Sequence, residues 1–187
     1  MTQEDVIGRV VDALREAGVL HMVTGSFASN LHGVPRMTQD ADIVVDAEEA
    51  AMLRFVHLVE QDFYVGLDAA REAVRLRRIF NVIHFDTGFK VDLIVKKNRP
   101  FSTEEIRRRE PGTLAGKQVD FATAEDTILT KLEWAFLSGS ERQYRDAAGI
   151  IQVQAARLDW PYLERWASEL GIADLLDRAR RAEPCGD

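Results

Sequence analysis

Two carboxylates spaced by one residue, Asp40 and Asp42, stand at the start of the apolar run Ile43–Val45. In an extended strand, residues i and i+2 project from the same face, so these two carboxylates would lie side by side. Neighbouring carboxylates repel each other unless positive charge lies between them, and a divalent cation is the usual source of that charge. The spacing therefore predicts a strand with a cation site at its beginning.

The residues before this strand predict a turn that can hold phosphate. An apolar run from Val19 ends at Gly25-Ser26, and a short helical segment closed by Gly33 follows. Glycine lets backbone N–H groups approach an anion, the hydroxyl of Ser26 can donate to a phosphate oxygen, and a helix N-terminus favours negative charge. Taken alone, a Gly-Ser pair more often marks a simple turn between a strand and a helix.

A third carboxylate, Asp92, lies in the second half of a predicted β-hairpin. The runs Ile79–Phe85 and Phe89–Val95 are rich in β-branched and aromatic residues, and the turn residues Asp86-Thr87-Gly88 join them. A carboxylate inside such a run is costly to bury unless it is paired or bound to a metal. Three carboxylates can hold two divalent ions, and their hard oxygen ligands suit Mg²⁺.

The rest of the chain predicts an α/β (α+β) fold, in which a short mixed β-sheet is flanked by helices. We expect a catalytic core at residues 1–121 and a helical C-terminal subdomain at residues 122–187. Asp46 is interpreted as the N-cap of the next helix, and residues 96–116 as a loop with one short helix. Helix starts in the C-terminal third are predicted at Thr123, Ser140 and Asp159.

Composition narrows the class of protein. Among 187 residues, 24 are Lys or Arg and 31 are Asp or Glu, and the net charge of −7 argues mildly against a general nucleic-acid-binding surface. The only cysteine, Cys185, excludes a disulfide framework and a cysteine-based metal site, which fits a reducing cytosol. No apolar run approaches the length of a membrane span. We therefore expect a soluble cytoplasmic protein.

Gly25-Ser26, Asp40-x-Asp42 and Asp92 together resemble the nucleotidyltransferase superfamily with the polymerase-beta-like core. The resemblance implies that Gly25 and Ser26 hold nucleotide phosphates. It also implies that the three aspartates bind two Mg²⁺ ions and promote attack on the α-phosphate of an NTP. Many members carry a basic residue soon after the Gly-Ser pair, where this chain has none.

Three residues outside these motifs are further candidates for nucleotide contacts. Arg36 is a candidate to replace the basic residue missing after Gly-Ser. Residues 124–132 and 142–146 resemble the AbiEii-type branch, known for toxins of type IV toxin–antitoxin systems. That resemblance implies that Lys131 contacts the triphosphate and that Asp146 is the acidic residue on the next helix, a candidate substrate contact. Lys131 could instead be an ordinary solvated lysine, and Asp146 an ion-pair partner of Lys131 or Arg142.

The expected function is a Mg²⁺-dependent nucleotidyltransferase that moves a nucleoside monophosphate from an NTP, such as ATP, to an acceptor and releases pyrophosphate. The acceptor could be tRNA or another RNA, a protein or a small molecule, and a toxin of this kind would have a cognate antitoxin protein. Two alternatives stay open. One is a small-molecule adenylyltransferase of the antibiotic-resistance type, and the other is a non-catalytic nucleotide-binding module.

Overall fold

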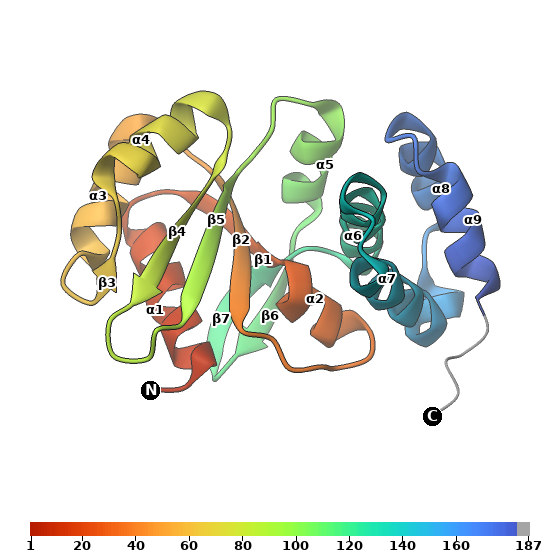
Figure 1. Ribbon diagram of the computed structural model, residues 1–187, viewed down its shortest axis with the longest axis horizontal. Coiled ribbons are helices and arrows are strands. Elements are labelled where there is room, and N and C mark those ends of the chain that lie inside the picture. The colour runs from red at the N-terminus through yellow and green to blue at the C-terminus, as the bar shows by residue number, and fades with distance from the viewer. Residues whose placement is uncertain (183–187) are drawn as a thin grey trace. The chain divides into compact units, whose positions relative to one another are not determined.

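The computed structural model describes residues 1–182, and these form two compact units (Figure 1). The first unit comprises Met1–Thr24 and Thr38–Phe121, and the second comprises Gly25–Met37 and the chain from Ala122 onward. The predicted boundary after residue 121 is also a boundary between the units, and the segment with the Gly-Ser pair belongs to the second. Cys185 lies outside the described residues.

The first unit is built on a mixed sheet, which confirms the predicted α/β class. Within residues 1–182 the sheet has seven strands in the order β3-β4-β5-β2-β1-β7-β6. At its centre, β2 pairs in parallel with β5 and antiparallel with β1. The strands are β1 Leu20–Thr24, β2 Asp40–Asp46, β3 Phe63–Tyr64, β4 Ile79–His84, β5 Lys90–Val95, β6 Glu110–Leu114 and β7 Lys117–Phe121.

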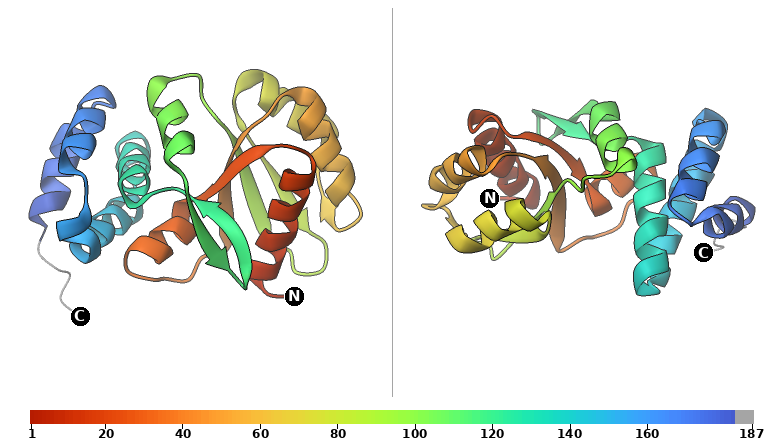
Figure 2. Two further views of the ribbon diagram at one scale, coloured as in Figure 1. Left: turned by 180° about the vertical axis from the view of Figure 1, so that it is seen from behind. Right: turned by 90° about the horizontal axis from the view of Figure 1, so that it is seen from above.

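Four helices complete this unit: α1 Gln3–Glu16, α3 Glu49–Val59, α4 Leu67–Leu76 and α5 Pro100–Arg108. Helix α1 begins with a capping box, in which the side chains of Thr2 and Asp5 each accept a backbone N–H from the other residue. Figure 2 (left) shows α1 lying across the sheet, and α1 contacts β1, β7 and α3. Its apolar residues are fully buried, as the helical period requires.

The side chains of strand β5 alternate between an apolar face of the sheet and a more polar face. Val91, Leu93 and Val95 are buried, with at most 1% of their surface exposed. Lys90 and Asp92 alternate with them and are only partly buried. Because side chains alternate between faces along a strand, Asp92 is directed away from the face that carries the buried valines and leucine.

The predicted N-cap role of Asp46 is wrong. Asp46 is the last residue of β2, and α3 begins only at Glu49, after Glu48, whose side chain makes no capping hydrogen bond. The Asp46 carboxylate instead pairs with Arg77 and Lys96, each at 3.4 Å. The Asp46 carboxylate thus interacts with two cationic side chains instead of accepting backbone N–H groups at the start of α3.

The predicted loop at residues 96–116 contains a strand as well as a helix. Strand β6 pairs antiparallel with β7 through the two-residue turn Ala115-Gly116, where both φ angles are positive, at 49° and 79°. Such a turn matches the twist of a hairpin. Pro111 and Gly112 give β6 little intrinsic strand propensity, and proline is tolerated because β6 is at the edge of the sheet.

The second unit is helical, with α2 Gly25–His32, α6 Ala124–Ser138, α7 Glu141–Gln154, the 3-10 helix Ala155–Arg157, α8 Trp160–Glu169 and α9 Ala173–Arg181. The predicted N-caps Thr123, Ser140 and Asp159 each accept a backbone N–H, which confirms these three helix starts. Within residues 1–182, every helix is too short or too polar to cross a lipid bilayer.

Hydrogen bonds fix α2 to the longer helices of its unit. The ring of His32 bonds the carbonyl oxygen of Ala122 through Nε2 at 2.8 Å, and Gln154 Nε2 donates to the carbonyl of His32 at 2.8 Å. Next to His32, a Cβ atom on Gly33 would lie only 2.9 Å from Ile150 Cγ1, so α2 ends in close contact with α7.

Candidate functional site

The sheet brings the three predicted aspartates together on one face. Asp42 and Asp92 are Cα partners across the parallel β2–β5 pair, and Asp40 precedes Asp42 by two residues on the same face. Neighbouring strands lie about 4.8 Å apart, so the carboxyl groups of Asp42 and Asp92 are immediate neighbours. The side chain of Asp40 is 44% exposed and that of Asp92 is 18% exposed. Thr38 donates its hydroxyl to Asp40 Oδ1 at 3.3 Å.

Lys90 provides the positive charge between these carboxylates. Its Nζ donates to Asp92 Oδ2 at 2.8 Å and lies 3.6 Å from Asp40 Oδ2. The hydrogen bond to Asp92 raises the pKa of Lys90 above its ordinary value, against the opposing effect of burial. Sequence reasoning missed this residue. The available signal was its position two residues before Asp92 on a predicted strand, which puts both side chains on one face.

The donor types on this face fit a hard divalent cation, because carboxylate oxygens are the ligands that Mg²⁺ prefers. The backbone register supplies them from two neighbouring central strands. Within residues 1–182, however, no three His, Cys, Asp or Glu side chains are arranged to hold a metal ion. Two of the three carboxylates are directed to the ammonium of Lys90 instead, so cation binding at this face requires their oxygens to turn from Lys90.

In the second unit, the Gly-Ser pair begins α2. Gly25 has a φ of 61°, a left-handed conformation that glycine adopts without the steric cost of a Cβ atom. Ser26 is 8% exposed, and its hydroxyl oxygen accepts a hydrogen bond from Arg36 Nη2 at 2.8 Å. Arg36 is in turn held by Asn30 of α2, which bonds the backbone N–H and carbonyl of Arg36 at 3.0 and 2.7 Å.

Arg36, Lys131 and Asp146 form one ionic cluster. Arg36 donates from Nε to Asp146 Oδ1 at 2.9 Å and from Nη2 to Oδ2 at 2.8 Å, and Lys131 Nζ donates to Oδ2 at 2.8 Å. Burial alone would raise the pKa of Asp146, but the hydrogen bonds from Arg36 and Lys131 outweigh it and hold the pKa below its ordinary value. Asp146 thus has the ion pair with Lys131 that was one of its two predicted roles.

Exposure differs within this cluster. The side chain of Lys131 is 4% exposed and that of Asp146 is 9% exposed, whereas 28% of the Arg36 side chain is exposed. A cavity of about 350 Å³ lies beside Arg36 and Asp146. Its other lining residues come from α7 and its surroundings, namely Val34, Tyr144, Arg145, Ala148, Gly149, Gln152 and Ala182. Arg36 is therefore the member of the cluster that an added anion reaches most easily.

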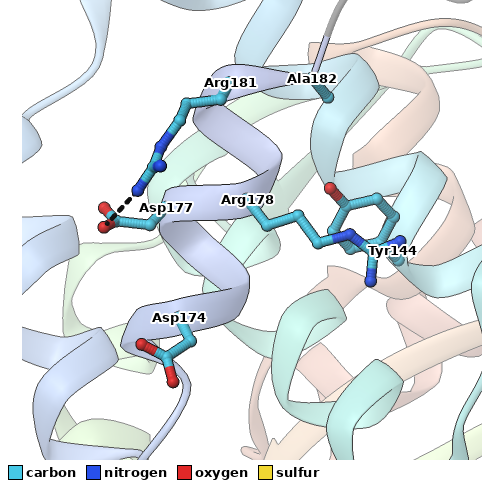
Figure 3. Close-up of a pocket in the computed structure, with 6 residues that line it drawn as sticks. All are labelled: Tyr144, Asp174, Asp177, Arg178, Arg181 and Ala182. Carbon is cyan, nitrogen blue, oxygen red and sulfur yellow. Dashed lines mark hydrogen bonds and ion pairs between the residues drawn. The ribbon is translucent and has the colours of Figure 1, made fainter.

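A more open cavity of about 680 Å³ lies between α7 and α9 and shares Tyr144 with the first (Figure 3). The guanidinium of Arg178 lies over the ring of Tyr144, 4.4 Å from its centroid. Arg181 pairs with Asp177 at 3.1 Å, and Asp174 completes the charged lining. Both cavities are thus lined by arginines at least as much as by carboxylates.

Comparisons with known proteins identify the fold. No family model matches the chain, and no curated protein matches it. The crystal structure of an antigenic nucleotidyltransferase-like protein from Paracoccidioides brasiliensis is similar over 97% of this chain and 93% of that one, with a TM-score of 0.56 and 15% identity. ANT(2'')-Ia in complex with adenylyl-2''-tobramycin is similar over 97% of this chain and 100% of that one, with a TM-score of 0.55 and 16% identity. The solution structure of this antibiotic-resistance factor gives a TM-score of 0.52 at 18% identity, over 89% of this chain and 94% of that one. The fold is thus that of nucleotidyltransferase-like proteins.

Proposed function

We propose that this protein transfers a nucleoside monophosphate from an NTP to an acceptor hydroxyl, in a Mg²⁺-dependent reaction that releases pyrophosphate. The observation that carries the proposal is the pairing of Asp42 with Asp92 on adjacent central strands, with Asp40 on the same face. Three carboxylates gathered on a sheet repel one another, and divalent cations bound between them would offset that repulsion. The nucleotidyltransferase-like fold supports the same conclusion.

The three aspartates would share the metal-binding role. Two Mg²⁺ ions held by Asp40, Asp42 and Asp92 would neutralise the triphosphate and lower the pKa of the acceptor hydroxyl. Asp92 is the less exposed of the two aspartates that contact Lys90, and in our proposal its carboxylate accepts the proton of the attacking hydroxyl. The new bond joins the acceptor oxygen to the α-phosphorus as the bond to the pyrophosphate oxygen breaks.

The second unit holds three of the residues predicted to contact the nucleotide, namely Gly25, Ser26 and Arg36. Arg36 is the most accessible member of its ionic cluster, and its guanidinium already donates to Ser26 and Asp146 in a fixed orientation. We propose that Arg36 and the hydroxyl of Ser26 donate to phosphate oxygens, and that the left-handed Gly25 lets the chain approach them. Lys131 is almost fully buried, so its part in this proposal is to neutralise Asp146 and keep Arg36 in place.

For the acceptor, we propose a molecule with a free hydroxyl group. ANT(2'')-Ia was solved with an adenylylated aminoglycoside, which favours a small-molecule acceptor as one candidate.

A toxin that modifies tRNA or protein is the second candidate, favoured by the α6 and α7 sequences around Lys131 and Asp146. Expression of the wild-type chain should then arrest growth, and the product of a neighbouring gene should relieve the arrest. Growth unaffected by a well-expressed, NTP-active protein would exclude the toxin role and leave the transferase proposal standing.

The direct test is to incubate the protein with each α-³²P-labelled NTP, Mg²⁺ and total cell extract, and to separate RNA, protein and small molecules. We expect label from one NTP to enter one fraction, and chelation with EDTA to abolish it. Label in purified tobramycin or kanamycin would instead identify a small-molecule adenylyltransferase of the antibiotic-resistance type. Metal-dependent NTP binding without transfer to any fraction would contradict the proposal and favour a non-catalytic nucleotide-binding module.

A further inference from the structure

We propose that Lys90 is a built-in counter-ion of the aspartate face, and that a divalent cation binds there by displacing its ammonium group. Lys90 would thereby set the affinity of the protein for the metal. This inference rests on the proposed function, because it concerns the same three carboxylates, but it assigns a role to a residue outside the predicted metal ligands.

The position of Lys90 follows from strand geometry. It is the first residue of β5, two residues before Asp92 and on the same face, and its Cα partner across the parallel pair is Asp40. The ammonium therefore reaches one carboxylate along its own strand and another across the sheet, at 2.8 and 3.6 Å. A contact to one of them alone would be an ordinary ion pair, whereas contact with both places the charge inside the cluster.

The arrangement of the carboxylates agrees with this role. No three acidic or histidine side chains within residues 1–182 are arranged around a metal position, although the backbone register brings three aspartates together. The Asp40 and Asp92 oxygens are directed to Lys90 instead. A divalent cation and an ammonium group cannot use the same oxygens without strong repulsion, so one must replace the other.

Lys90 has the freedom to leave. Its side chain is 38% exposed, and lysine carries its charge on a flexible four-carbon stem with a compact head group. Lys96 offers a matched control, because it lies one residue beyond the other end of β5 and pairs with Asp46 at 3.4 Å, outside the aspartate trio.

The test is a calorimetric titration of nucleotide-free protein with Mg²⁺, repeated with Mn²⁺ by electron paramagnetic resonance. We expect Lys90→Met to bind either ion about two- to fivefold more tightly than wild type, the range that loss of a competing, partly exposed ion pair gives. Lys96→Met and Lys90→Arg should bind close to the wild-type affinity. Asp42→Asn should abolish the binding in the wild-type and Lys90→Met backgrounds alike.

A second readout uses the wild-type protein and so does not depend on the folding of any variant. In ¹⁵N-labelled protein, addition of Mg²⁺ should shift the ammonium resonance of Lys90 and leave that of Lys96 unchanged.

Thermal unfolding gives a third readout. The metal-free Lys90→Met variant should have a lower Tm than wild type, and Mg²⁺ should raise the Tm of the variant by more than it raises the Tm of wild type.

The outcomes separate this inference from the function on which it rests. Equal or weaker metal affinity in Lys90→Met, or a Lys90 resonance that ignores bound Mg²⁺, would overturn the counter-ion role while the metal-dependent function stands. If wild type, Lys90→Met and Asp42→Asn all lack measurable divalent binding, the metal site of the proposed function fails, and the role of Lys90 fails with it.

Discussion

Asp146 and Arg36 form a two-point ion pair, in which both carboxylate oxygens accept hydrogen bonds from one guanidinium, at 2.9 and 2.8 Å. Lys131 adds a third hydrogen bond to the same carboxylate from a side chain that is only 4% exposed. The pair is 110 residues apart in the sequence and fixes the loop after α2 to α7. A buried charge in this setting depends on its partners, because water cannot replace them.

Substitution of Asp146 by asparagine should destabilise the protein by about 2–4 kcal/mol, since it leaves the buried Lys131 ammonium without its carboxylate. Urea unfolding followed by circular dichroism measures the change. The matched control is Asp177→Asn, which breaks the pair with Arg181 at a side chain that is 61% exposed and should cost less than about 1 kcal/mol. Equal effects of the two variants would contradict the structural role of the Asp146 cluster.

Two glycines of the helical unit should respond to alanine in opposite directions. At Gly33, an added Cβ would lie 2.9 Å from Ile150 Cγ1 and 3.0 Å from its backbone nitrogen, so α7 must move, at a cost of about 1–3 kcal/mol. At Gly149, inside α7, the nearest atom would be Val34 Cγ2 at 3.5 Å, an ordinary contact. Helix propensity should then stabilise Gly149→Ala by up to about 1 kcal/mol. Thermal unfolding of both variants tests the close packing of α2 on α7.

The buried His21 should make the free energy of unfolding depend on pH. Burial lowers the pKa of His21 below its ordinary value of 6.5, although the hydrogen bond to the carbonyl of Val19 at 2.8 Å opposes this effect. Below pH 6.5 the unfolded chain therefore binds more protons at this residue than the folded one, and the free energy of unfolding falls. Urea unfolding should give a lower free energy of unfolding at pH 5.5 than at pH 7.5, and His21→Asn should reduce this difference.

The sequence predicted the sheet around the aspartates because the relevant signals are local. Asp40 and Asp42 share a face by the two-residue period of a strand, and the hairpin that carries Asp92 has clear turn residues. What no local pattern contains is the register, which places Asp42 beside Asp92 and Lys90 beside Asp40. The spacing of Lys90 and Asp92 was a local signal, whereas the contact of Lys90 with Asp40 follows only from that register.

The difference between local and tertiary signals also explains the two errors in the predicted fold, at Asp46 and at residues 96–116. Asp46 has the residue type and position of an N-cap, yet its carboxylate pairs with the cations Arg77 and Lys96, which lie 31 and 50 residues further along the chain. Strand β6 forms although Pro111 and Gly112 disfavour it, because its partner β7 and the Ala115-Gly116 turn supply the pairing. In both places a tertiary interaction overrides the local preference.

The central claim is that the paired aspartates of β2 and β5 carry metal-dependent nucleotidyl transfer. The most direct test measures transfer from the α-³²P-labelled NTP and acceptor fraction identified for wild type, with Asp42→Asn and Asp46→Asn compared at equal protein concentration. Both variants remove one negative charge from β2. Asp42 is the Cα partner of Asp92 in the sheet, whereas the Asp46 carboxylate forms ion pairs with Arg77 and Lys96. We predict that Asp42→Asn loses at least about a hundredfold in transfer rate with its Tm retained, while Asp46→Asn stays within about twofold of wild type. Transfer by Asp42→Asn at the wild-type rate would contradict the account.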